Sequence, residues 1–249
     1  MKTSNMLQVK SFSSVSTLCS PDCPICYGLG FYRVDCEIND PQFGKLMDCP
    51  CVDPFVLNGK ECGINEKDYQ KCWKNIVPIN NIQDAVSKLR KVQKAGSGWV
   101  YIYGSYGLGK STLLQTMVAE CIRSKRKAKY TSMAMILDDI RSTFSYQNPI
   151  GEFERKMDYY YNVDVLCIDE FNRVNRTEFA DEKIHAIMDN RYRSAINGDS
   201  ITVIASNIQP NEYDPAISDR IYDNRFFIVK LFGDSARPNI PNMWSENVN

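Results

Sequence analysis

The chain has 249 residues, 43% of them hydrophobic and 24% charged, which suits one sizeable α/β domain with a small additional module. Its 30 basic and 30 acidic residues leave no net charge, so the molecule is not a polycation and any nucleic-acid contact must come from a local patch. The chain has no apolar run of the roughly 18 residues that span a bilayer, and the N-terminal MKTSNMLQVKSF lacks the apolar core of a signal peptide. We therefore expect a cytoplasmic protein without membrane contact.

The first part of the chain predicts little regular structure. Residues 1–18 are serine-rich and weakly patterned, which predicts a flexible tail. Residues 19–55 are dense in Cys, Gly and Pro and contain only short strand-like pieces, such as 30–35. A segment of this kind buries little apolar surface and needs a cross-link, such as a structural metal or disulfides, to hold its fold. Residues 56–80 predict a linker with one short helix near 66–73.

Strand and helix patterns alternate over residues 81–237, which we predict to be one α/β domain, followed by a C-terminal tail, 238–249. Helical apolar spacing and buried-type strands alternate here, with helices at 82–94, 110–122, 133–144, 153–161 and 178–196, and strands at 99–103, 128–132, 163–168, 201–205 and 226–231. Five apolar strands separated by helices predict a parallel sheet with helices on both faces.

A phosphate-binding loop is the clearest motif. The segment GSYGLGKST, residues 104–112, fits G-x-x-x-x-G-K-[ST] between a predicted strand and a predicted helix. Glycines let successive N–H groups face phosphate oxygens, and the helix N-terminus adds partial positive charge. The alternative is a glycine-rich turn that binds nothing. The predicted ATP-binding residues are Gly104, Tyr106, Gly107, Leu108, Gly109, Lys110, Ser111 and Thr112, with Lys110 on the β- and γ-phosphates and Ser111 on Mg²⁺.

Two acidic residues follow the predicted strand 163–168. A carboxylate at this point lies at the carboxyl edge of the sheet, beside the phosphate loop. Asp169 is predicted to hold Mg²⁺ through water, and Glu170 to orient or deprotonate the attacking water. The alternative for Glu170 is a residue that merely starts a helix.

Two further polar residues are candidates for catalysis. Asn207 follows a predicted strand at the same sheet edge and could contact the γ-phosphate or the water; alternatively it forms a turn. Arg220 precedes the last strand and could act as a finger on the ATP of a neighbouring subunit. The alternative is a surface salt bridge with Asp219 or Asp223.

Eight of the ten cysteines precede residue 73, and in a reducing compartment clustered cysteines indicate metal before disulfides. Two close pairs suit one tetrahedral zinc ion: Cys23, Cys26, Cys49 and Cys51. The alternatives are that Cys36 or Cys19 replaces one of these ligands, or that the segment holds no metal.

A basic stretch covers residues 84–129, where ten Lys and Arg residues stand against Asp84 and Glu120, a balance of 10 − 2 = +8. This stretch predicts a patch that contacts DNA phosphates. The alternative is a solvated helix end that complements the helix dipole. We expect the only histidine, His185, to be a surface residue.

Six segments, taken in order, resemble the DnaC/DnaI-type helicase loaders and the related IstB-type transposition ATPases of the AAA+ class. They are GSYGLGKST, VDVLCIDE, DNRY at 189–192, TVIASN, SDRIYD and GDSAR ending at Arg237. The resemblance covers roughly residues 65–237. The amino-terminal CPICYGLGFYR and DPQFGKLMDCPC resemble the zinc-binding head of loader-like proteins.

This resemblance implies a sheet in the order 5-1-4-3-2, ATP hydrolysis stimulated by oligomerisation or DNA, and ATP-dependent self-assembly. It also implies single-stranded DNA as one partner and a replicative helicase as another, the latter bound through a zinc-ribbon-like head. The short stretch after Arg237 implies that a full helical lid is lacking. The resemblance assigns the phosphate-loop roles to Lys110 and Ser111, the metal role to Asp169 and the water role to Glu170. It assigns the sensor role to Asn207 and the finger role to Arg220.

Two other functions remain open at this stage. One is an IstB-like transposition ATPase that binds duplex DNA and a transposase. The other is a nucleic-acid-binding cysteine head for which the ATPase acts as a switch.

Overall fold

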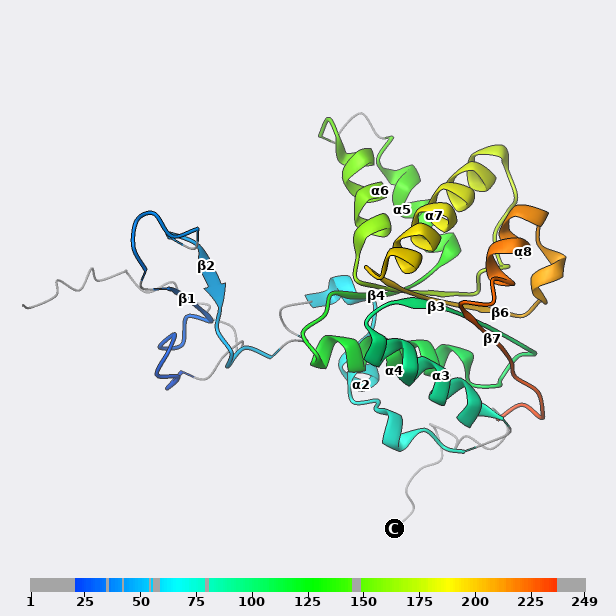
Figure 1. Cartoon of the computed structure of the whole chain (residues 1–249), viewed down its shortest axis with the longest axis horizontal. Helices are drawn as coiled ribbons and strands as arrows, with labels where there is room; N and C mark the ends of the chain where they lie inside the picture. The colour runs from blue at the N-terminus through cyan, green and yellow to red at the C-terminus, as the bar shows by residue number, and fades with distance from the viewer. Residues whose placement is uncertain are drawn as a thin grey trace, which may run out of the picture. The chain divides into compact units, whose positions relative to one another are not determined.

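The computed structural model describes residues 21–34, 36–41, 43–53, 55, 59–78, 81–144 and 149–236. The chain divides into two compact units, Met1–Leu57 and Asn58–Asn249, called here the N-terminal unit and the C-terminal unit (Figure 1). The predicted tails, Cys19 and Arg237 lie outside the described residues.

The N-terminal unit contains a small antiparallel sheet. Strand β1 (Phe31–Arg33) pairs with β2 (Leu46–Asp48), with Phe31 opposite Asp48. The buried centre of the unit consists of three cysteines and one valine: Cys23, Cys26, Cys49 and Val52. Because strands of three residues bury so little apolar surface, the unit depends on this cysteine centre for its fold.

The C-terminal unit is built on a parallel five-stranded sheet, in the order β4-β5-β6-β3-β7. The strands are β3 (Gly98–Tyr103), β4 (Ala128–Ser132), β5 (Val165–Asp169), β6 (Ile201–Ser206) and β7 (Phe227–Lys230). Numbered from β3, this order is 5-1-4-3-2, so the predicted topology is confirmed. Strands β5 and β6 are buried along their whole length, as their continuous apolar runs predict for a sheet covered on both faces.

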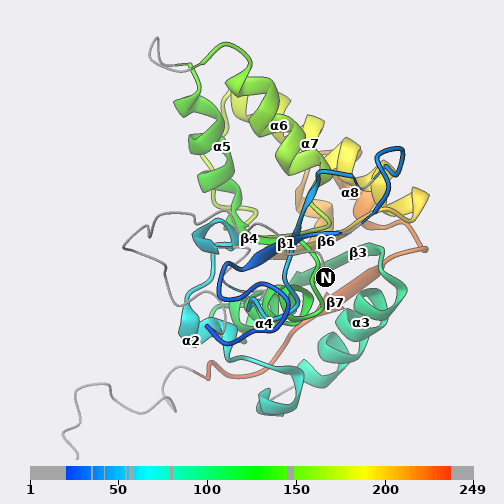
Figure 2. The same cartoon turned by 90° about the vertical axis from the view of Figure 1, so that its left-hand side faces the viewer.

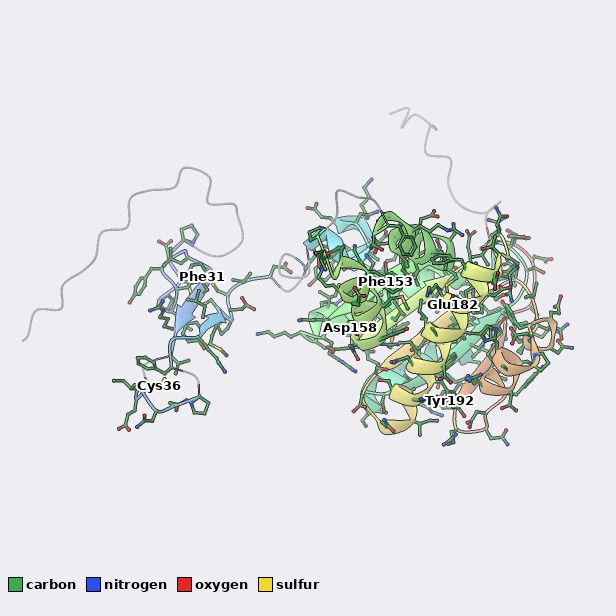
Figure 3. The ribbon with its side chains drawn as sticks, turned by 90° about the horizontal axis from the view of Figure 1, so that it is seen from above. Phe31, Cys36, Phe153, Asp158, Glu182 and Tyr192 are labelled. Atoms are coloured by element: carbon green, nitrogen blue, oxygen red, sulfur yellow. The ribbon has the colours of Figure 1, made fainter. Side chains whose placement is uncertain are left out.

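Helices cover both faces of this sheet (Figure 1). On one side lie α2 (Glu66–Tyr69), α3 (Ile82–Ala95) and α4 (Lys110–Arg123), and on the other α5 (Met133–Ser142), α6 (Glu152–Asn162), α7 (Glu178–Asn197) and α8 (Pro215–Ile221). Figure 2 shows α5 and α6 side by side above the sheet. In Figure 3, α6 with Phe153 and Asp158 runs beside α7 with Glu182 and Tyr192. In the described part of the chain, no helix is long and apolar enough to cross a membrane.

A segment with little regular structure packs against α3, α4 and β4 of the C-terminal unit. It includes the short helices η1 (Gly59–Cys62) and η2 (Trp73–Asn75), on either side of α2. The indole N–H of Trp73 donates to Gln93 over 2.7 Å, and its backbone N–H donates to the Glu120 carboxylate over 3.0 Å. The sequence pattern predicts a linker here, yet these bonds tie the segment to α3 and α4.

Part of the basic stretch serves this attachment. Arg123 donates to the backbone oxygens of Tyr69 and Lys71 over 2.5 and 2.6 Å, and Lys129 donates to that of Glu61 over 2.6 Å. Other members of the stretch are exposed, among them Arg90, Lys91, Lys94, Lys125 and Lys127. The stretch is therefore divided between internal attachment and solvent.

Arg191 of α7 is a fully buried cation that joins the starts of two strands. Its guanidinium donates to the backbone oxygens of Tyr161, Val163 and Ile201 over 3.0, 2.6 and 2.6 Å, and to the Thr202 hydroxyl over 2.9 Å. Burial lowers its pKa to about 10. This arginine of the DNRY segment therefore has a structural task, which is to fix β5 and β6 to α7.

Candidate functional site

A cavity of about 410 Å³ lies in the C-terminal unit at the carboxyl edge of the sheet. Its walls come from the phosphate loop, the ends of β5 and β6, and the segment 71–77. The predicted site residues on its walls are Tyr106, Gly107, Leu108, Gly109, Lys110, Ser111, Thr112, Asp169, Glu170 and Asn207. Among the described residues, neither Gly104 nor Arg220 belongs to this lining.

The phosphate loop requires its glycines for space as well as for backbone conformation. A Cβ on Gly104 would lie 2.3 Å from the Leu231 backbone oxygen, and one on Gly107 would lie 2.0 Å from the Ser235 hydroxyl. Both glycines have positive φ, +148° and +78°. The Ala236 N–H donates to the Gly107 oxygen over 3.0 Å, so the chain after β7 packs directly on the loop.

Lys110 is the first residue of α4 and is 9% exposed. Its ammonium donates to the backbone oxygens of Gly104 and Ser105 over 2.6 and 2.8 Å. The charge is thus held over the loop, at the positive end of the α4 dipole. This arrangement suits an anion with several oxygens, because loop amides, ammonium and helix terminus all attract negative charge.

Asp169 ends β5, and both of its carboxylate oxygens have partners. One accepts a hydrogen bond from the Tyr130 hydroxyl over 2.8 Å, and the other accepts from the Glu170 N–H over 2.8 Å. Asp169 is 6% exposed and shares the cavity wall with Ser111. A carboxylate and a hydroxyl on one wall are the hard oxygen donors that Mg²⁺ prefers, so the residues present fit this ion.

Glu170 has an unusual backbone for a residue with a side chain. Its φ of +47° lies in the left-handed region, where non-glycine residues are uncommon and tend to occur at functional sites. Its carboxylate is paired with Arg173 over 2.7 Å. Because α7 begins only at Glu178, the interpretation of Glu170 as a helix-start residue is wrong.

Asn207 lies at the end of β6 and on the cavity wall. Its backbone N–H and the Ser206 hydroxyl both donate to the Asn172 side-chain oxygen over 3.1 Å. The turn after β5 is thereby joined to the end of β6.

Two arginines lie near the start of β7, outside the cavity. Arg220 of α8 donates to Asp189 and to the Ala216 oxygen, each over 2.6 Å, rather than to Asp219 or Asp223 as the salt-bridge alternative predicted. Arg225, which the sequence pattern did not single out, binds Asp223 and donates to the Tyr192 hydroxyl over 3.0 Å. Its guanidinium, with the Tyr192 hydroxyl, holds the pKa of Asp223 well below its usual range. The Arg225 side chain is 58% exposed and that of Arg220 25%.

The sequence patterns did not indicate Tyr130, Arg173 or the wall formed by Lys71, Cys72 and Asn75. A tyrosine inside a predicted strand next to the acidic strand was the one available signal for Tyr130. His185 is partly exposed and lies 3.5 Å from Asp214, so it is outside the candidate site.

The N-terminal unit brings the four predicted zinc ligands together. Among the described residues, Cys23, Cys26, Cys49 and Cys51 have sulfurs that all lie within 4.8 Å of one another, and Cys36 is not in the group. The Cys23–Cys49 and Cys26–Cys51 sulfurs are 3.6 and 3.5 Å apart. Four sulfurs at about 2.3 Å from one tetrahedral zinc would be about 3.8 Å apart, so the donor set fits this ion.

The surroundings of two of these thiols, Cys23 and Cys26, favour the thiolate that zinc requires, whereas burial raises the pKa of the Cys49 thiol. Burial alone would raise the pKa of the Cys26 thiol, but the Gly30 N–H and the Cys51 thiol outweigh it and lower the pKa to about 6. Backbone N–H groups of Cys26 and Ile25 lower the pKa of Cys23. Figure 3 places Cys36 on the loop that follows β1.

A parallel sheet in the order 5-1-4-3-2, with a phosphate loop after its first strand and an Asp–Glu pair after its third, defines an ATP-binding AAA+ ATPase. The chain belongs to the family of bacterial DnaA ATPase domains, whose family model matches residues 73–227. One curated relative, the chromosomal replication initiator protein DnaA of Campylobacter jejuni, is 27% identical over 112 residues. The match covers 45% of this chain and 24% of that relative, so the chain spans about a quarter of its length.

Solved structures share the fold at low sequence identity. A replication initiator DnaA bound to AMPPCP and single-stranded DNA has a TM-score of 0.57 and 21% identity, and the match covers 68% of this chain and 51% of that one. The DnaC helicase loader has a TM-score of 0.53 and 16% identity, with coverage of 68% and 100%.

Proposed function

We propose that this protein is an ATP-dependent helicase loader in DNA replication, which binds a replicative helicase and single-stranded DNA and hydrolyses ATP to ADP and phosphate. The observation that carries this proposal is the cavity that unites Lys110, Ser111, Asp169 and Glu170. A cytoplasmic location is part of the proposal.

Within the site, the loop amides and Lys110 would bind the β- and γ-phosphates, while Ser111 and Asp169 would hold Mg²⁺. When bound, this ion would neutralise phosphate charge. Glu170 would orient the attacking water and accept its proton, and Asn207 would contact the γ-phosphate. All five named residues lie on the wall of one cavity, which supports these roles.

An arginine from a neighbouring subunit would complete the site, which makes ATP-dependent self-assembly part of the proposal. Arg220 is the first candidate, because the family resemblance assigns it this role. Arg225 is the second, because its side chain is the more exposed of the two and lies two residues before β7. Hydrolysis by a lone subunit would then be weak.

The N-terminal unit would be a zinc-binding module over residues 19–55, and the ATPase domain would cover 81–237. The predicted linker, 56–80, would join the two, with its second half bonded to α3 and α4 through Trp73. The four thiols of the module would supply a complete structural zinc site. Several large apolar side chains of this unit are exposed, and exposed apolar patches mark protein contacts. The residues are Ile25, Tyr27, Leu29, Phe31 and Leu46, exposed by 45–77%. Since such a surface suits a protein partner better than nucleic acid, we assign the helicase contact to this unit.

The C-terminal unit would contact single-stranded DNA. Support comes from the similarly folded DnaA bound to single-stranded DNA and from the exposed lysines and arginines of the basic stretch. The proteins named above are replication initiators and a helicase loader, which favours the loader over the transposition alternative.

Co-purification of the full chain with a hexameric replicative helicase, with and without MgATP, tests this proposal. We expect Phe31→Ser to weaken capture of the helicase without altering ATP binding. Phe232→Ser is the matched control, because Phe232 is an exposed phenylalanine of the C-terminal unit, 60% exposed against 45% for Phe31. Zinc-replete protein that has no affinity for adenine nucleotides with Mg²⁺ would rule the proposal out.

A further inference from the structure

Tyr130 reaches the carboxyl edge of the sheet from a strand that carries none of the proposed site residues. It lies in β4, opposite Cys167 of β5, and its hydroxyl donates to an Asp169 carboxylate oxygen over 2.8 Å. This is a diagonal contact between neighbouring strands, because Asp169 lies two residues beyond Cys167. Long side chains can make such contacts, so the placement follows from the register of β4 and β5.

The Tyr130 phenol is partly buried beside the Asp169 carboxylate that accepts its hydrogen bond. Burial, and then the Asp169 charge, raise the pKa of Tyr130 well above its ordinary value. The phenol is therefore protonated at neutral pH and acts as a donor to the carboxylate.

The Asp169 carboxylate is consequently held at both oxygens. Tyr130 holds one from the neighbouring strand, and the Glu170 N–H holds the other from the same chain segment. Outer hydrogen-bond partners of this kind fix the orientation of a ligating group and so determine how tightly it binds a metal.

We propose that Tyr130 is a positioning residue for the metal end of the nucleotide site, where its hydroxyl orients Asp169. The inference rests on the proposed function of this site and adds a residue from β4 to it. Tyr130 does not contact the phosphates; its effect passes through Asp169.

The test uses Tyr130→Phe, which removes only the hydroxyl. Tyr160→Phe is the matched control: the Tyr160 hydroxyl donates to Asp139 over the same 2.8 Å, but neither residue lines the cavity. Binding of a fluorescent ATP analogue to the full chain is measured in EDTA and at increasing Mg²⁺. We expect Tyr130→Phe to raise the half-saturating Mg²⁺ concentration by about 10-fold or more. Tyr160→Phe should match the wild type, and all three proteins should bind equally in EDTA.

A second comparison asks whether Tyr130 acts through Asp169. In an Asp169→Asn background, Tyr130→Phe should raise the half-saturating Mg²⁺ concentration little further, because substitutions of contacting residues that work together do not have additive effects. A full additional rise in the half-saturating Mg²⁺ concentration would overturn the inference. So would a half-saturating Mg²⁺ concentration of Tyr130→Phe within about twofold of that of the wild type. Weaker binding of Tyr130→Phe in EDTA would also overturn it, since the defect would then lie in the pocket as a whole. If the wild type itself lacks Mg²⁺-dependent nucleotide binding, the proposed function fails together with this inference. Wild-type binding with an unaffected Tyr130→Phe overturns the inference alone.

Discussion

The Glu170 carboxylate lies 2.7 Å from the Arg173 guanidinium, three residues further along the chain. The same guanidinium lies 5.5 Å from the ring centroid of Tyr106, in the phosphate loop. Arg173 thus joins the proposed water-orienting residue to the rim of the loop. Both side chains of the ion pair are about half exposed, and exposed pairs contribute at most about 1 kcal/mol. A ligand or partner could therefore separate them at small cost.

Arg173→Ala should raise the basal rate of ATP hydrolysis, because Glu170 loses the partner that holds its carboxylate. An increase of up to about fivefold corresponds to a pair worth about 1 kcal/mol. The control is Arg155→Ala, which breaks a similar exposed pair with Glu152 on α6. Steady-state phosphate release measures the effect. If Arg173→Ala instead lowers the rate while nucleotide binding is intact, Arg173 supports catalysis rather than restraining Glu170.

Lys110→Ala should abolish ATP binding, because it removes the one ammonium held over the phosphate loop by backbone oxygens. A ligand at 100 times its Kd stabilises a protein by about 2.7 kcal/mol, which is readily seen as a rise in Tm. The wild type should show this rise with MgATP and Lys110→Ala should not. Lys91→Ala, an exposed lysine of α3, is the control. Equal stabilisation of both variants by MgATP would contradict the assigned role.

The elements that the sequence predicted best are those with local signals. The phosphate loop, Asp169 and the continuous apolar strands β5 and β6 depend on spacing within one segment, and the structure has them close to the predicted bounds. Helix α8 was not predicted, although Asp214 caps it and Pro215 occupies its first position. A helix of seven residues contains too few apolar positions to show a period.

The parts that the sequence could not supply depend on contacts between distant segments. Tyr130 meets Asp169 because of the register of β4 on β5, and Trp73 meets Gln93 because an irregular segment lies on the helices. Strand β2 was missed for a similar reason, since its three residues are a strand only through pairing with β1. No spacing rule within one segment contains this information.

Arg220→Ala should leave ATP binding intact and lower turnover, by roughly 10³-fold if the arginine acts as a finger. Mixing this variant with Lys110→Ala should restore part of the activity, because Lys110→Ala subunits still carry Arg220. The turnover of Arg225→Ala is measured in the same way, alone and mixed with Lys110→Ala. If only Arg225→Ala shows the loss and the recovery, the finger role moves to Arg225. If no mixture of either pair recovers turnover, action between subunits is contradicted.

Removal of zinc should unfold the N-terminal unit and leave the nucleotide site of the C-terminal unit intact. The first unit has a centre of three cysteines and a valine, whereas the second has a large apolar core of its own. We expect about one zinc ion per chain in the wild type and a loss in Cys26→Ser, measured by elemental analysis. Cys62→Ser is the control, because this buried cysteine lies outside the cluster. A Cys26→Ser protein with full zinc content would contradict the four-cysteine site.

Arg191→Met should destabilise the C-terminal unit strongly. The substitution keeps an unbranched side chain but removes the guanidinium from three backbone oxygens: the buried contacts with Val163 and Ile201 and the part-buried one with Tyr161. Each such group costs about 1–3 kcal/mol, so we expect a loss of about 3 kcal/mol or more in the free energy of unfolding, measured with urea.

The matched control for this change is Arg193→Ala, two residues away on α7. Arg193 is 73% exposed and forms an ion pair with Asp189, so its loss should lower the free energy of unfolding by at most about 1 kcal/mol. Near-equal effects of the two variants would mean that water replaces the guanidinium at the buried oxygens. Since these oxygens lie where β5 and β6 begin, a large effect confined to Arg191→Met would show that one buried cation sets the position of both strands whose far ends form the candidate site.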